Sequence, residues 1–469
     1  MKKKKKRSIV PVLILFVLLA CLAAGFFFLF PRISFKDGER VYEKGEIYPA
    51  ESVVVKANGT LTPENDVLDT AAVGEHHFRY TVKKLFFTRE LDFVYEVVDT
   101  TPPKIEIRES TVYRDPGETY TEEEMRANIT VDEGTLSFST DYDPQYSGTY
   151  TVFVHAVDDS GNESDASYEA VVKDTEAPVM FRSGNGAQIL VGKDFDIHSV
   201  IGYGDNADPV QDLKIDGEVD TSEPGIYPLH VAVTDASGNR KEWDLDVEVV
   251  EEIPKSEPYE YEYPFEEFMD DYAGSRRKFG IDVSEWQGDI DFEAAKEAGC
   301  EFVIIRVGWS YLGELNVDKK FHQNLERAKA AGMQVGIYLF CYDNNDADLI
   351  SSTGKMFAEL GDVSLDMPVV FDWENFRNFQ EYEISFQQLN HLYDVFEKEV
   401  AKRGYESMLY GSAYYLRTVW NHTDTRPVWM AQYAAYPNYQ GKYQIWQASD
   451  SGKLAGIDGP VDLNIWYTR

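Results

Sequence analysis

Cysteine, histidine and basic residues are all scarce in this sequence. The three cysteines, Cys21, Cys300 and Cys341, are too few and too far apart for a disulfide framework. The eight histidines show no H-x₃-H or HExxH spacing, so we expect no metal site and no cofactor. Lys and Arg number 45 against 82 Asp and Glu, a net charge of −37. That balance argues against a nucleic-acid partner, because phosphate backbones require basic residues.

Charge is also absent from residues 8–30, which directly follow the basic run Lys2 to Arg7. About 20 apolar residues span a bilayer, so residues 8–30 predict a transmembrane helix. The positive-inside rule then makes residues 1–7 a cytoplasmic tail and places the C-terminal domains outside the cell, in a single-pass protein of the cell membrane. A cleaved signal peptide is the alternative, but its apolar core is shorter and ends at small residues, whereas here the apolar run continues through Phe30.

Residues 34–250 contain a repeat with a period near 75. A glycine followed by alternating apolar and polar residues begins a strand pattern at Gly74, Gly148 and Gly225. Two copies continue into an Asp-x-Ser-Gly-Asn turn, and the units end in Asp-Thr-x-x-Pro joints. The pattern predicts three small all-β sandwiches over residues 34–99, 103–174 and 178–250.

The three units resemble the bacterial immunoglobulin-like modules that occur in tandem on cell-surface proteins. Their Asp-rich turns offer oxygen ligands that calcium would accept, but calcium needs six to eight oxygens, and plain turn chemistry is the favoured interpretation. The expected role of the modules is a spacer that carries the C-terminal domain, with cell-envelope proteins as possible partners. The acidic residues 251–277, which have no periodicity, predict a solvated linker.

From residue 278 to 469 the sequence alternates strand and helix patterns. Strands are expected at 279–283, 302–307, 335–340, 368–371, 408–410, 428–431, 443–447 and 461–463, and helices at 291–298, 318–331, 346–360 and 384–403. Five strand–helix units followed by three strands predict an α/β barrel of the TIM type. Cys300 and Cys341 then fall at opposite ends of the barrel, so no disulfide is expected between them.

Three of these strands are expected to end in acids. Asp282 comes after the first strand, Asp372 and Glu374 come after the fourth, and Asp462 lies at the eighth. Active sites of such barrels lie at the carboxyl ends of the strands, and the first strand neighbours the eighth. The four carboxylates are therefore expected at one opening, in a pattern suited to acid–base chemistry.

Several ordered motifs in this domain are similar to those of glycoside hydrolase family 25, the lysozymes. They are Gly280 to Asp291, the Phe371-Asp372-Trp373-Glu374 segment, Trp429 to Tyr433, Gln444 to Gln447, and Gly456 to Asn464. The resemblance covers residues 279–469. It departs at Phe340 to Asp343, where the family has a His-containing segment, so it does not extend to the substrate contacts at that rim.

The resemblance implies cleavage of the β-1,4 bond between N-acetylmuramic acid and N-acetylglucosamine in peptidoglycan, without a cofactor. Glycoside hydrolysis needs one protonated acid and one carboxylate, and crowding keeps an acid protonated. We expect Glu374 to be the general acid and Asp372 to stabilise charge or orient the acetamido group of the sugar. Asp282 and Asp462 would hold the network and bind substrate.

Five aromatic side chains are candidates for stacking on sugar rings: Tyr338, Tyr410, Trp429, Tyr433 and Trp446. A place in the barrel core is the alternative for each of them. Arg306 is expected to pair with the carboxylates.

The sequence thus predicts a membrane-anchored peptidoglycan hydrolase that faces the cell wall and acts in its remodelling. The alternative is a catalytically retired glycan-binding or scaffold protein.

Overall fold

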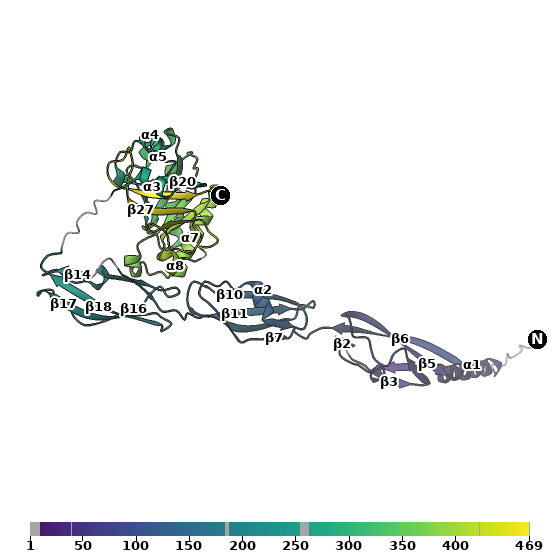
Figure 1. Ribbon diagram of the computed structural model, residues 1–469. Helices are drawn as coiled ribbons and strands as arrows, with labels where there is room; N and C mark the ends of the chain where they lie inside the picture. Colours follow the sequence, from purple (N-terminus) through teal and green to yellow (C-terminus); the bar gives the residue numbers. More distant parts are fainter. Residues whose placement is uncertain (1–9, 39, 183–186, 254–261, 422, 469) are drawn as a thin grey trace, which may run out of the picture. The chain divides into compact units, whose positions relative to one another are not determined.

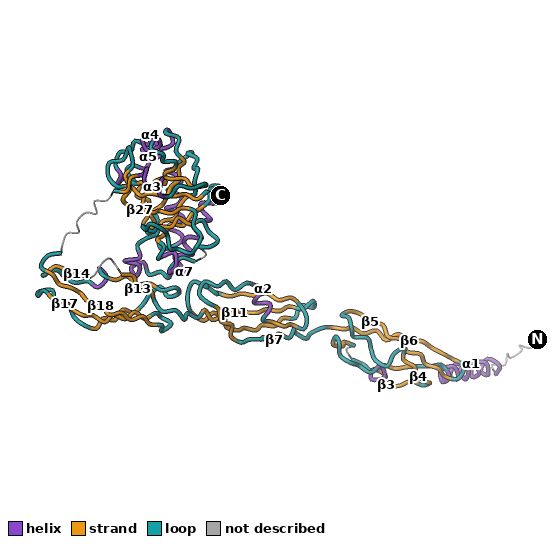
Figure 2. Tube along the Cα trace, in the orientation of Figure 1, coloured by secondary structure: helices purple, strands orange, loops and turns teal. Residues whose placement is uncertain are grey.

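The computed structural model describes residues 10–38, 40–182, 187–253, 262–421 and 423–468 (Figure 1). By internal contacts the chain forms two compact units. The first comprises Met1–Ser110, Thr121–Thr140 and Val152–Tyr168, and the second comprises Thr111–Tyr120, Asp141–Thr151 and Glu169–Arg469. Figure 2 shows that strands dominate up to residue 250, whereas helices and strands alternate after it.

The N-terminal segment contains helix α1 (Val10–Leu29). Across the described part of the chain, no helix is long and apolar enough to cross a membrane. This finding contradicts the predicted transmembrane helix over 8–30 and the predicted single-pass location in the cell membrane. The prediction rested on an uncharged stretch of sequence, which is a weaker criterion than a helix of sufficient length and apolarity. The predicted basic tail, 1–7, lies outside the described residues.

Three β modules follow, and each has a four-stranded and a two-stranded sheet. The four-stranded sheets have the orders β2-β6-β5-β4, β10-β11-β12-β8 and β14-β18-β17-β16, and the two-stranded sheets are β1-β3, β7-β9 and β13-β15. Their elements are β1 (Ile33–Phe35), β2 (Val41–Glu43), η1 (Ala50–Val53), β3 (Val54–Ala57), β4 (Thr60–Pro63), β5 (Gly74–Lys84), β6 (Phe87–Val98), β7 (Ile105–Ile107), β8 (Thr111–Arg114), α2 (Glu122–Ala127), β9 (Ile129–Val131), β10 (Thr135–Thr140), β11 (Gly148–Val157), β12 (Glu163–Val172), β13 (Val179–Arg182), β14 (Ala187–Leu190), η2 (Ile197–Ser199), β15 (Ile201–Gly204), β16 (Asp212–Asp216), β17 (Gly225–Thr234) and β18 (Arg240–Val250).

The three glycine-initiated strands expected from the repeat are present as β5, β11 and β17. Their alternation places one face in each module core: in β5, for example, Phe78, Tyr80 and Val82 are buried. The modules are not purely β, because α2 forms in the second one. Thr121 and Glu124 build a capping box that accounts for the start of that helix.

The C-terminal domain is a closed barrel of eight strands. They are β20 (Arg277–Val283), β21 (Phe302–Tyr311), β23 (Gln334–Cys341), β24 (Val369–Asp372), β25 (Ser407–Ser412), β26 (Val428–Ala431), β27 (Ile445–Lys453) and β28 (Val461–Tyr467), with β22 (Glu314–Val317) paired to β21. The helices are α4 (Phe292–Glu297), α5 (Phe321–Ala330), α6 (Asp346–Leu360), α7 (Phe386–Ala401) and the short α8 (Tyr415–Thr418), with single 3₁₀ segments η3 (Glu285–Gln287) and η4 (Phe376–Tyr382).

The last strand distinguishes this barrel from the expected TIM type. Neighbouring strands from β20 to β27 pair in parallel, but β28 is antiparallel to both β27 and β20. The connection from β27 to β28 is short and contains no helix, and it returns the chain in the opposite direction. The first residues of β28 therefore lie at the same barrel end as the carboxyl ends of the other strands.

Strand alternation divides the barrel residues into two layers. Val370, Met408 and Trp429 belong to the inner cluster, whereas Val369 and Phe371 pack outward in the larger core beneath the helices. Cys300 and Cys341 are both buried and free, as expected from their places at opposite ends of their strands.

Two segments outside the predicted barrel pack onto it. Part of the expected linker forms β19 (Tyr263–Pro264), which pairs with β27, and α3 (Phe265–Asp271), whose Phe268 is fully buried. The remaining residues of that linker at 254–261 lie outside the described residues.

The third module also contacts the barrel domain, through β15 and η4. A Cβ atom at Gly202 would lie 2.4 Å from the carbonyl oxygen of Arg377, so glycine allows this close approach. The aromatic ring of Phe181 lies 5.6 Å from that of Phe376. Because η4 follows Glu374 almost directly, the third module supports the segment that carries the acids, beyond the spacer role expected from the sequence.

Candidate active site

The four predicted acids line a single cavity at one end of the barrel. Its volume is about 300 Å³, and its lining includes Asp282, Asp372, Glu374 and Asp462. The first two are buried, whereas the Glu374 side chain is exposed toward the cavity. Asp462 is the second residue of the antiparallel strand β28, where it pairs directly with Asp282 of β20. It thus reaches this end of the barrel from the beginning of its strand.

Asp282 and Asp462 form the first carboxyl pair. Asp282 Oδ1 accepts hydrogen bonds from Gln447 Nε2 at 3.0 Å and from Asn464 Nδ2 at 2.7 Å. Burial and the neighbouring charge of Asp282 raise the pKa of Asp462 to about 9. Burial also raises the pKa of Asp282, but its three hydrogen bonds act in the opposite direction. We infer that Asp462 carries a proton at neutral pH and donates it to Asp282.

Asp372 and Glu374 form the second pair. Burial and then the charge of Glu374 raise the pKa of Asp372 well above its ordinary value. Desolvation by the surrounding protein raises the pKa of Glu374; its hydrogen bond with Asp372 acts in the opposite direction, and the charge of Asp282 adds to the rise. The two side chains are hydrogen-bonded to each other, which requires a proton on one of them. Such groups titrate as a pair, so a proton on either carboxyl group is shared between the two.

Four of the five predicted aromatic residues line the cavity, namely Tyr338, Tyr410, Trp429 and Tyr433. Tyr433 is 54% exposed and therefore accessible to a ligand, whereas Tyr410 and Trp429 are buried and pack 4.7 Å apart. Trp446 does not line it. Alternation along β27 turns Ile445 and Gln447 inward and Trp446 into the outer core, where its Nε1 donates to the carbonyl oxygen of Gln432.

Sequence reasoning missed two amide residues that position Asp282. Gln447 Oε1 accepts from Tyr410 at 2.9 Å and from Tyr433 at 3.1 Å, while its amide nitrogen donates to Asp282. Asn464 Oδ1 accepts from Trp429 Nε1 at 2.8 Å. Both residues lie in the motifs that resemble the family. Their side chains contact Asp282 on another strand, and the pattern of a single strand does not show such contacts.

Two further residues line the cavity in ways that the sequence did not predict. Trp286 lines the cavity and is 79% exposed, so its ring is free to stack on a ligand. Arg306 also lines the cavity, but its ion pairs are with Asp318 at 2.7 Å and Glu285 at 3.4 Å. It was expected to pair with the four acids.

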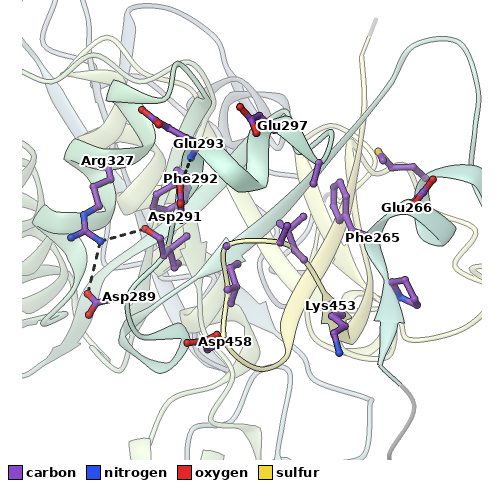
Figure 3. A pocket seen from close by; sticks show the side chains of 18 of the residues that line it. Phe265, Glu266, Asp289, Asp291, Phe292, Glu293, Glu297, Arg327, Lys453 and Asp458 are labelled. Carbon is purple, nitrogen blue, oxygen red and sulfur yellow. Dashed lines mark hydrogen bonds and ion pairs between the residues drawn. The ribbon is translucent and has the colours of Figure 1, made fainter.

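A larger cavity of about 1200 Å³ lies outside the barrel opening and contains none of the predicted site residues (Figure 3). Its labelled side chains come mainly from α3, α4 and the segment that joins β27 to β28. Arg327 lies 3.9 Å from Asp289 within it. The four predicted acids and four of the five predicted aromatic residues line the smaller cavity instead.

Comparison with known proteins agrees with this geometry. Residues 281–457 match the model of glycosyl hydrolases family 25, and residues 181–249 match that of the bacterial surface protein, Ig-like domain. The protein YegX of Escherichia coli O6:H1 is 30% identical over 196 residues, which cover 40% of this chain and 68% of YegX. The chain belongs to glycosyl hydrolases family 25. Its C-terminal domain is accordingly a glycoside hydrolase, called the family-25 barrel below.

Two curated lysozymes are similar to the family-25 barrel. The autolytic lysozyme of Clostridium acetobutylicum is 30% identical over 189 residues, 39% of this chain and 54% of that protein. Lysozyme M1 of Streptomyces globisporus is 30% identical over 202 residues, 39% of this chain and 66% of that protein. The chain thus spans only about half the length of the first of them.

Among solved structures, a family 25 glycosyl hydrolase from Bacillus anthracis has a TM-score of 0.38 and 20% identity, and the match covers 45% of this chain and 96% of that one. The modular autolysin LytC from Streptococcus pneumoniae has a TM-score of 0.38 and 21% identity, and the match covers 51% of this chain and 56% of that one.

Proposed function

We propose that this protein is a lysozyme that cleaves the β-1,4 bond between N-acetylmuramic acid and N-acetylglucosamine in peptidoglycan, and that it serves cell-wall remodelling. The observation that carries the proposal is that two carboxyl pairs, Asp282 with Asp462 and Asp372 with Glu374, line one cavity with aromatic walls. Glycoside hydrolysis requires a proton for the leaving oxygen and negative charge near the sugar ring, and this cavity offers both. The names of the two curated lysozymes support the choice of substrate.

Glu374 is proposed as the proton donor because it is the member of its pair that reaches the open cavity. It would hand the shared proton to the leaving oxygen as the glycosidic C–O bond breaks. Asp372 is buried directly beside it, so its carboxylate would then stabilise the positive charge that develops on the sugar ring, or orient the acetamido group to attack the ring carbon.

The other carboxyl pair is proposed to bind and position the sugar. Asp282 is held by Gln447, Asn464 and Asp462, so its orientation is fixed before substrate arrives. Exposed aromatic faces at Trp286 and Tyr433 would stack on the sugars at the edge of the cavity.

The immunoglobulin-like modules are proposed to contact the cell envelope. The support is the description of the model matched by residues 181–249, a bacterial surface protein domain.

Product analysis tests the proposed cleavage. The purified full chain is incubated with purified peptidoglycan, the new reducing ends are reduced with borohydride, and the released fragments are identified by mass spectrometry. We expect fragments that end in reduced N-acetylmuramic acid. Fragments that end in reduced N-acetylglucosamine would assign the enzyme to the other glycosidic bond, and binding without cleavage would indicate a glycan-binding protein instead.

A further inference from the structure

A second cluster of acids lies at one end of the third module, away from the barrel cavity. Asp174, Asp205, Asp208 and Asp235 are all buried, and one carboxylate oxygen from each lies within 4.8 Å of the others. Asp174 follows β12, the next two follow β15, and Asp235 begins the turn after β17. Three separate segments therefore bring four carboxylates to one point.

Among the described residues, no side-chain cation balances the charge of this cluster. None of its four carboxylates forms an ion pair with a Lys, Arg or His of the described residues. Asp205 is fully buried; its Oδ1 accepts from the main-chain amides of Ala207 and Asp208, both at 2.9 Å, but its Oδ2 has no hydrogen-bond partner. Burial, with the charges of Asp174 and Asp235, raises the pKa of Asp205 to about 7. An unpartnered carboxylate oxygen among three other carboxylates requires a proton or a cation.

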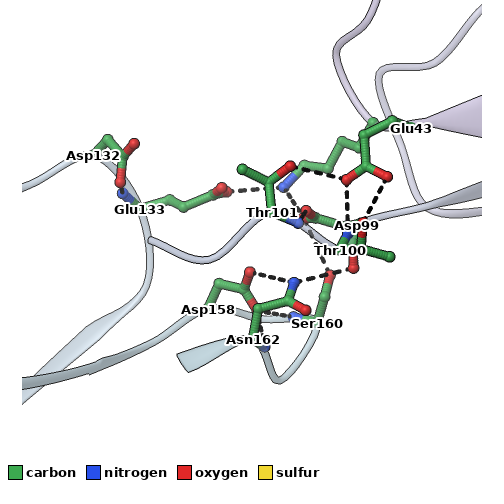
Figure 4. A network of polar contacts seen from close by, with 10 residues as sticks. Glu43, Asp99, Thr100, Thr101, Asp132, Glu133, Asp158, Ser160 and Asn162 are labelled. Atoms are coloured by element: carbon green, nitrogen blue, oxygen red, sulfur yellow. Dashed lines mark hydrogen bonds and ion pairs between the residues drawn. The ribbon is translucent and has the colours of Figure 1, made fainter. Parts of the chain in front are cut away.

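A related cluster at the end of the first module already contains a cation. There Asp99, Glu133 and Asp158 also bring carboxylate oxygens within 4.8 Å of one another. The Lys44 ammonium lies 2.8 Å from Asp99 and 2.9 Å from Glu133. Figure 4 shows Asp99, Glu133 and Asp158 in one network of polar contacts. These hydrogen bonds raise the pKa of Lys44 and keep it charged.

Both clusters use the same turn, so the comparison between them is close. Asp158 Oδ1 accepts from the main-chain amide of Asn162 at 2.8 Å, and Asp235 Oδ1 accepts from that of Asn239 at 2.7 Å. The turn chemistry expected from the sequence is therefore present at both places. What differs is the balance of charge, because the second cluster has one more carboxylate and no lysine.

We propose that Asp174, Asp205, Asp208 and Asp235 bind one calcium ion. The donors on offer are oxygens, with no His or Cys ligand in the cluster, which suits a hard cation rather than zinc or copper. Calcium binds oxygens at about 2.3–2.6 Å, so opposite ligands lie about 4.6–5.2 Å apart, a sphere that accommodates this cluster. Magnesium would draw opposite ligands to about 4.2 Å and demands stricter geometry.

Neighbouring groups offer access and further oxygens. A cavity of about 300 Å³ has Asp174 and Asn206 in its lining, which gives solvent and ions a path to the cluster. The Asn206 amide nitrogen donates to Asp174 at 3.1 Å, and the Asn206 Oδ1 has no hydrogen-bond partner. Together with water, these oxygens are sufficient to complete the six to eight that calcium takes.

The bound ion would stabilise a segment that contacts the family-25 barrel. The main-chain carbonyl of Asp205 accepts from the amide of Phe386 at 2.8 Å, and that of Asn206 accepts from the amide of Gln387 at 3.0 Å. Both donors lie in the first turn of α7. Calcium is therefore expected to hold the third module on the barrel domain without any part in the chemistry.

Calorimetric titration of the purified full chain tests this site. The protein is freed of metal with a chelator, exchanged into chelator-free buffer, and titrated with calcium chloride. We expect saturable binding of one calcium per chain at or below about 1 mM, and a higher unfolding temperature with calcium. Asp235→Asn removes one charged ligand while an amide oxygen still accepts from Asn239, so calcium binding should weaken at least tenfold.

Asp158→Asn is the matched control, because it makes the same change in the equivalent turn beside Lys44. It should leave calcium binding unchanged. Asp205→Asn provides a second variant in case Asp235→Asn fails to fold, and near-ultraviolet circular dichroism checks both. The absence of saturable binding to the wild-type chain, unchanged binding in both cluster variants, or loss of binding in Asp158→Asn would each overturn the proposal.

Discussion

The barrel cavity and the end of the third module each collect four carboxylates, yet their surroundings differ. In the barrel, each acid has a carboxyl partner, and amide donors from Gln447 and Asn464 hold Asp282. The acids there face an open cavity with aromatic walls. At the module end all four carboxylates are buried, and Asp205 Oδ2 has no hydrogen-bond partner, as Asp372 Oδ1 has none in the barrel. The difference indicates that a crowd of acids can be balanced by shared protons, which suits acid catalysis, or by a cation, which suits stability.

A cluster formed by residues of the first and second modules adds a third solution, in which Lys44 pairs with two of three carboxylates. An acidic motif in the sequence therefore does not determine its own counter-charge. The counter-charge depends on which side chains the fold places nearby.

After Glu374, the largest effect should come from replacing Asp372, the buried member of the pair. Asp372→Asn removes the carboxylate that we propose to stabilise the developing charge, and we expect the rate of peptidoglycan cleavage to fall about 10²–10³-fold. The rate is measured as reducing ends released at saturating substrate. Asp366→Asn, in the segment before the same strand, is the matched control and should keep normal activity. A rate within twofold of wild type for Asp372→Asn would contradict the catalytic role of the barrel acids and, with it, the contrast between the two clusters.

An intermediate effect is expected from Gln447, which connects Asp282 to two tyrosines. Gln447→Met has a similar size but neither donates to Asp282 nor accepts from Tyr410 and Tyr433. Losing a hydrogen bond to a charged group costs about 1.5–3 kcal/mol, so kcat should fall about 10–100-fold. The pH profile should also shift, because Asp282 loses a donor that favours its charged form. If kcat and the pH profile stayed unchanged, Gln447 would have only a packing role.

A smaller effect concerns the pH dependence of stability at the module end. The folded-state pKa of Asp205 is about 7, above the value near 3.9 of an unfolded chain. Its stabilising contribution is therefore complete below about pH 4 and is lost as the pH rises through 7. Asp174, Asp208 and Asp235 face this group, and their negative charge strengthens the effect.

Without calcium, the unfolding temperature should therefore fall between about pH 4 and 7, and saturating calcium should remove much of that fall. The carboxyl pairs of the barrel act in the same direction, so Asp205→Asn is needed to isolate the contribution of the module. Calorimetry at several pH values makes the comparison. An identical pH dependence with and without calcium would contradict it.

The smallest effect is expected at Lys44, because its cluster is partly exposed and water screens the charges. Lys44→Met leaves three carboxylates without their cation, and the unfolding temperature should fall slightly at low salt and recover at high salt. Lys56→Met, at an exposed lysine of the same module, should cause less change. An equal response of both variants to salt would show that Lys44 has no special place in the cluster.

The sequence predicted much of the barrel domain because its signals are local. Strand patterns around Asp282 and Asp372 located β20 and β24. Asp462 was predicted at the same opening because the eighth strand of a closed barrel neighbours the first. The direction of β28 could not be predicted from a three-residue apolar pattern, and it was this direction that determined how Asp462 reaches the site.

Other features depended on distant parts of the chain. The outward orientation of Trp446 followed from the exact register of β27, which a short apolar run leaves open by one residue. The grouping of Asp174 with Asp205, Asp208 and Asp235 required three loops to meet, and no single turn motif shows that. The uncharged stretch at 8–30 predicted a membrane span that the described helices do not support.

The most direct test of the account is the rate at which Glu374→Gln releases reducing ends from peptidoglycan, beside Glu381→Gln as the matched control. Glu374 is exposed toward the cavity, whereas Glu381 is exposed on η4 and lines no part of it. We expect a loss of about 10²–10⁴-fold for Glu374→Gln, with unchanged unfolding temperature and glycan binding, and normal activity for Glu381→Gln. Wild-type activity in Glu374→Gln would contradict the assignment of the proton donor and, with it, the proposed mechanism.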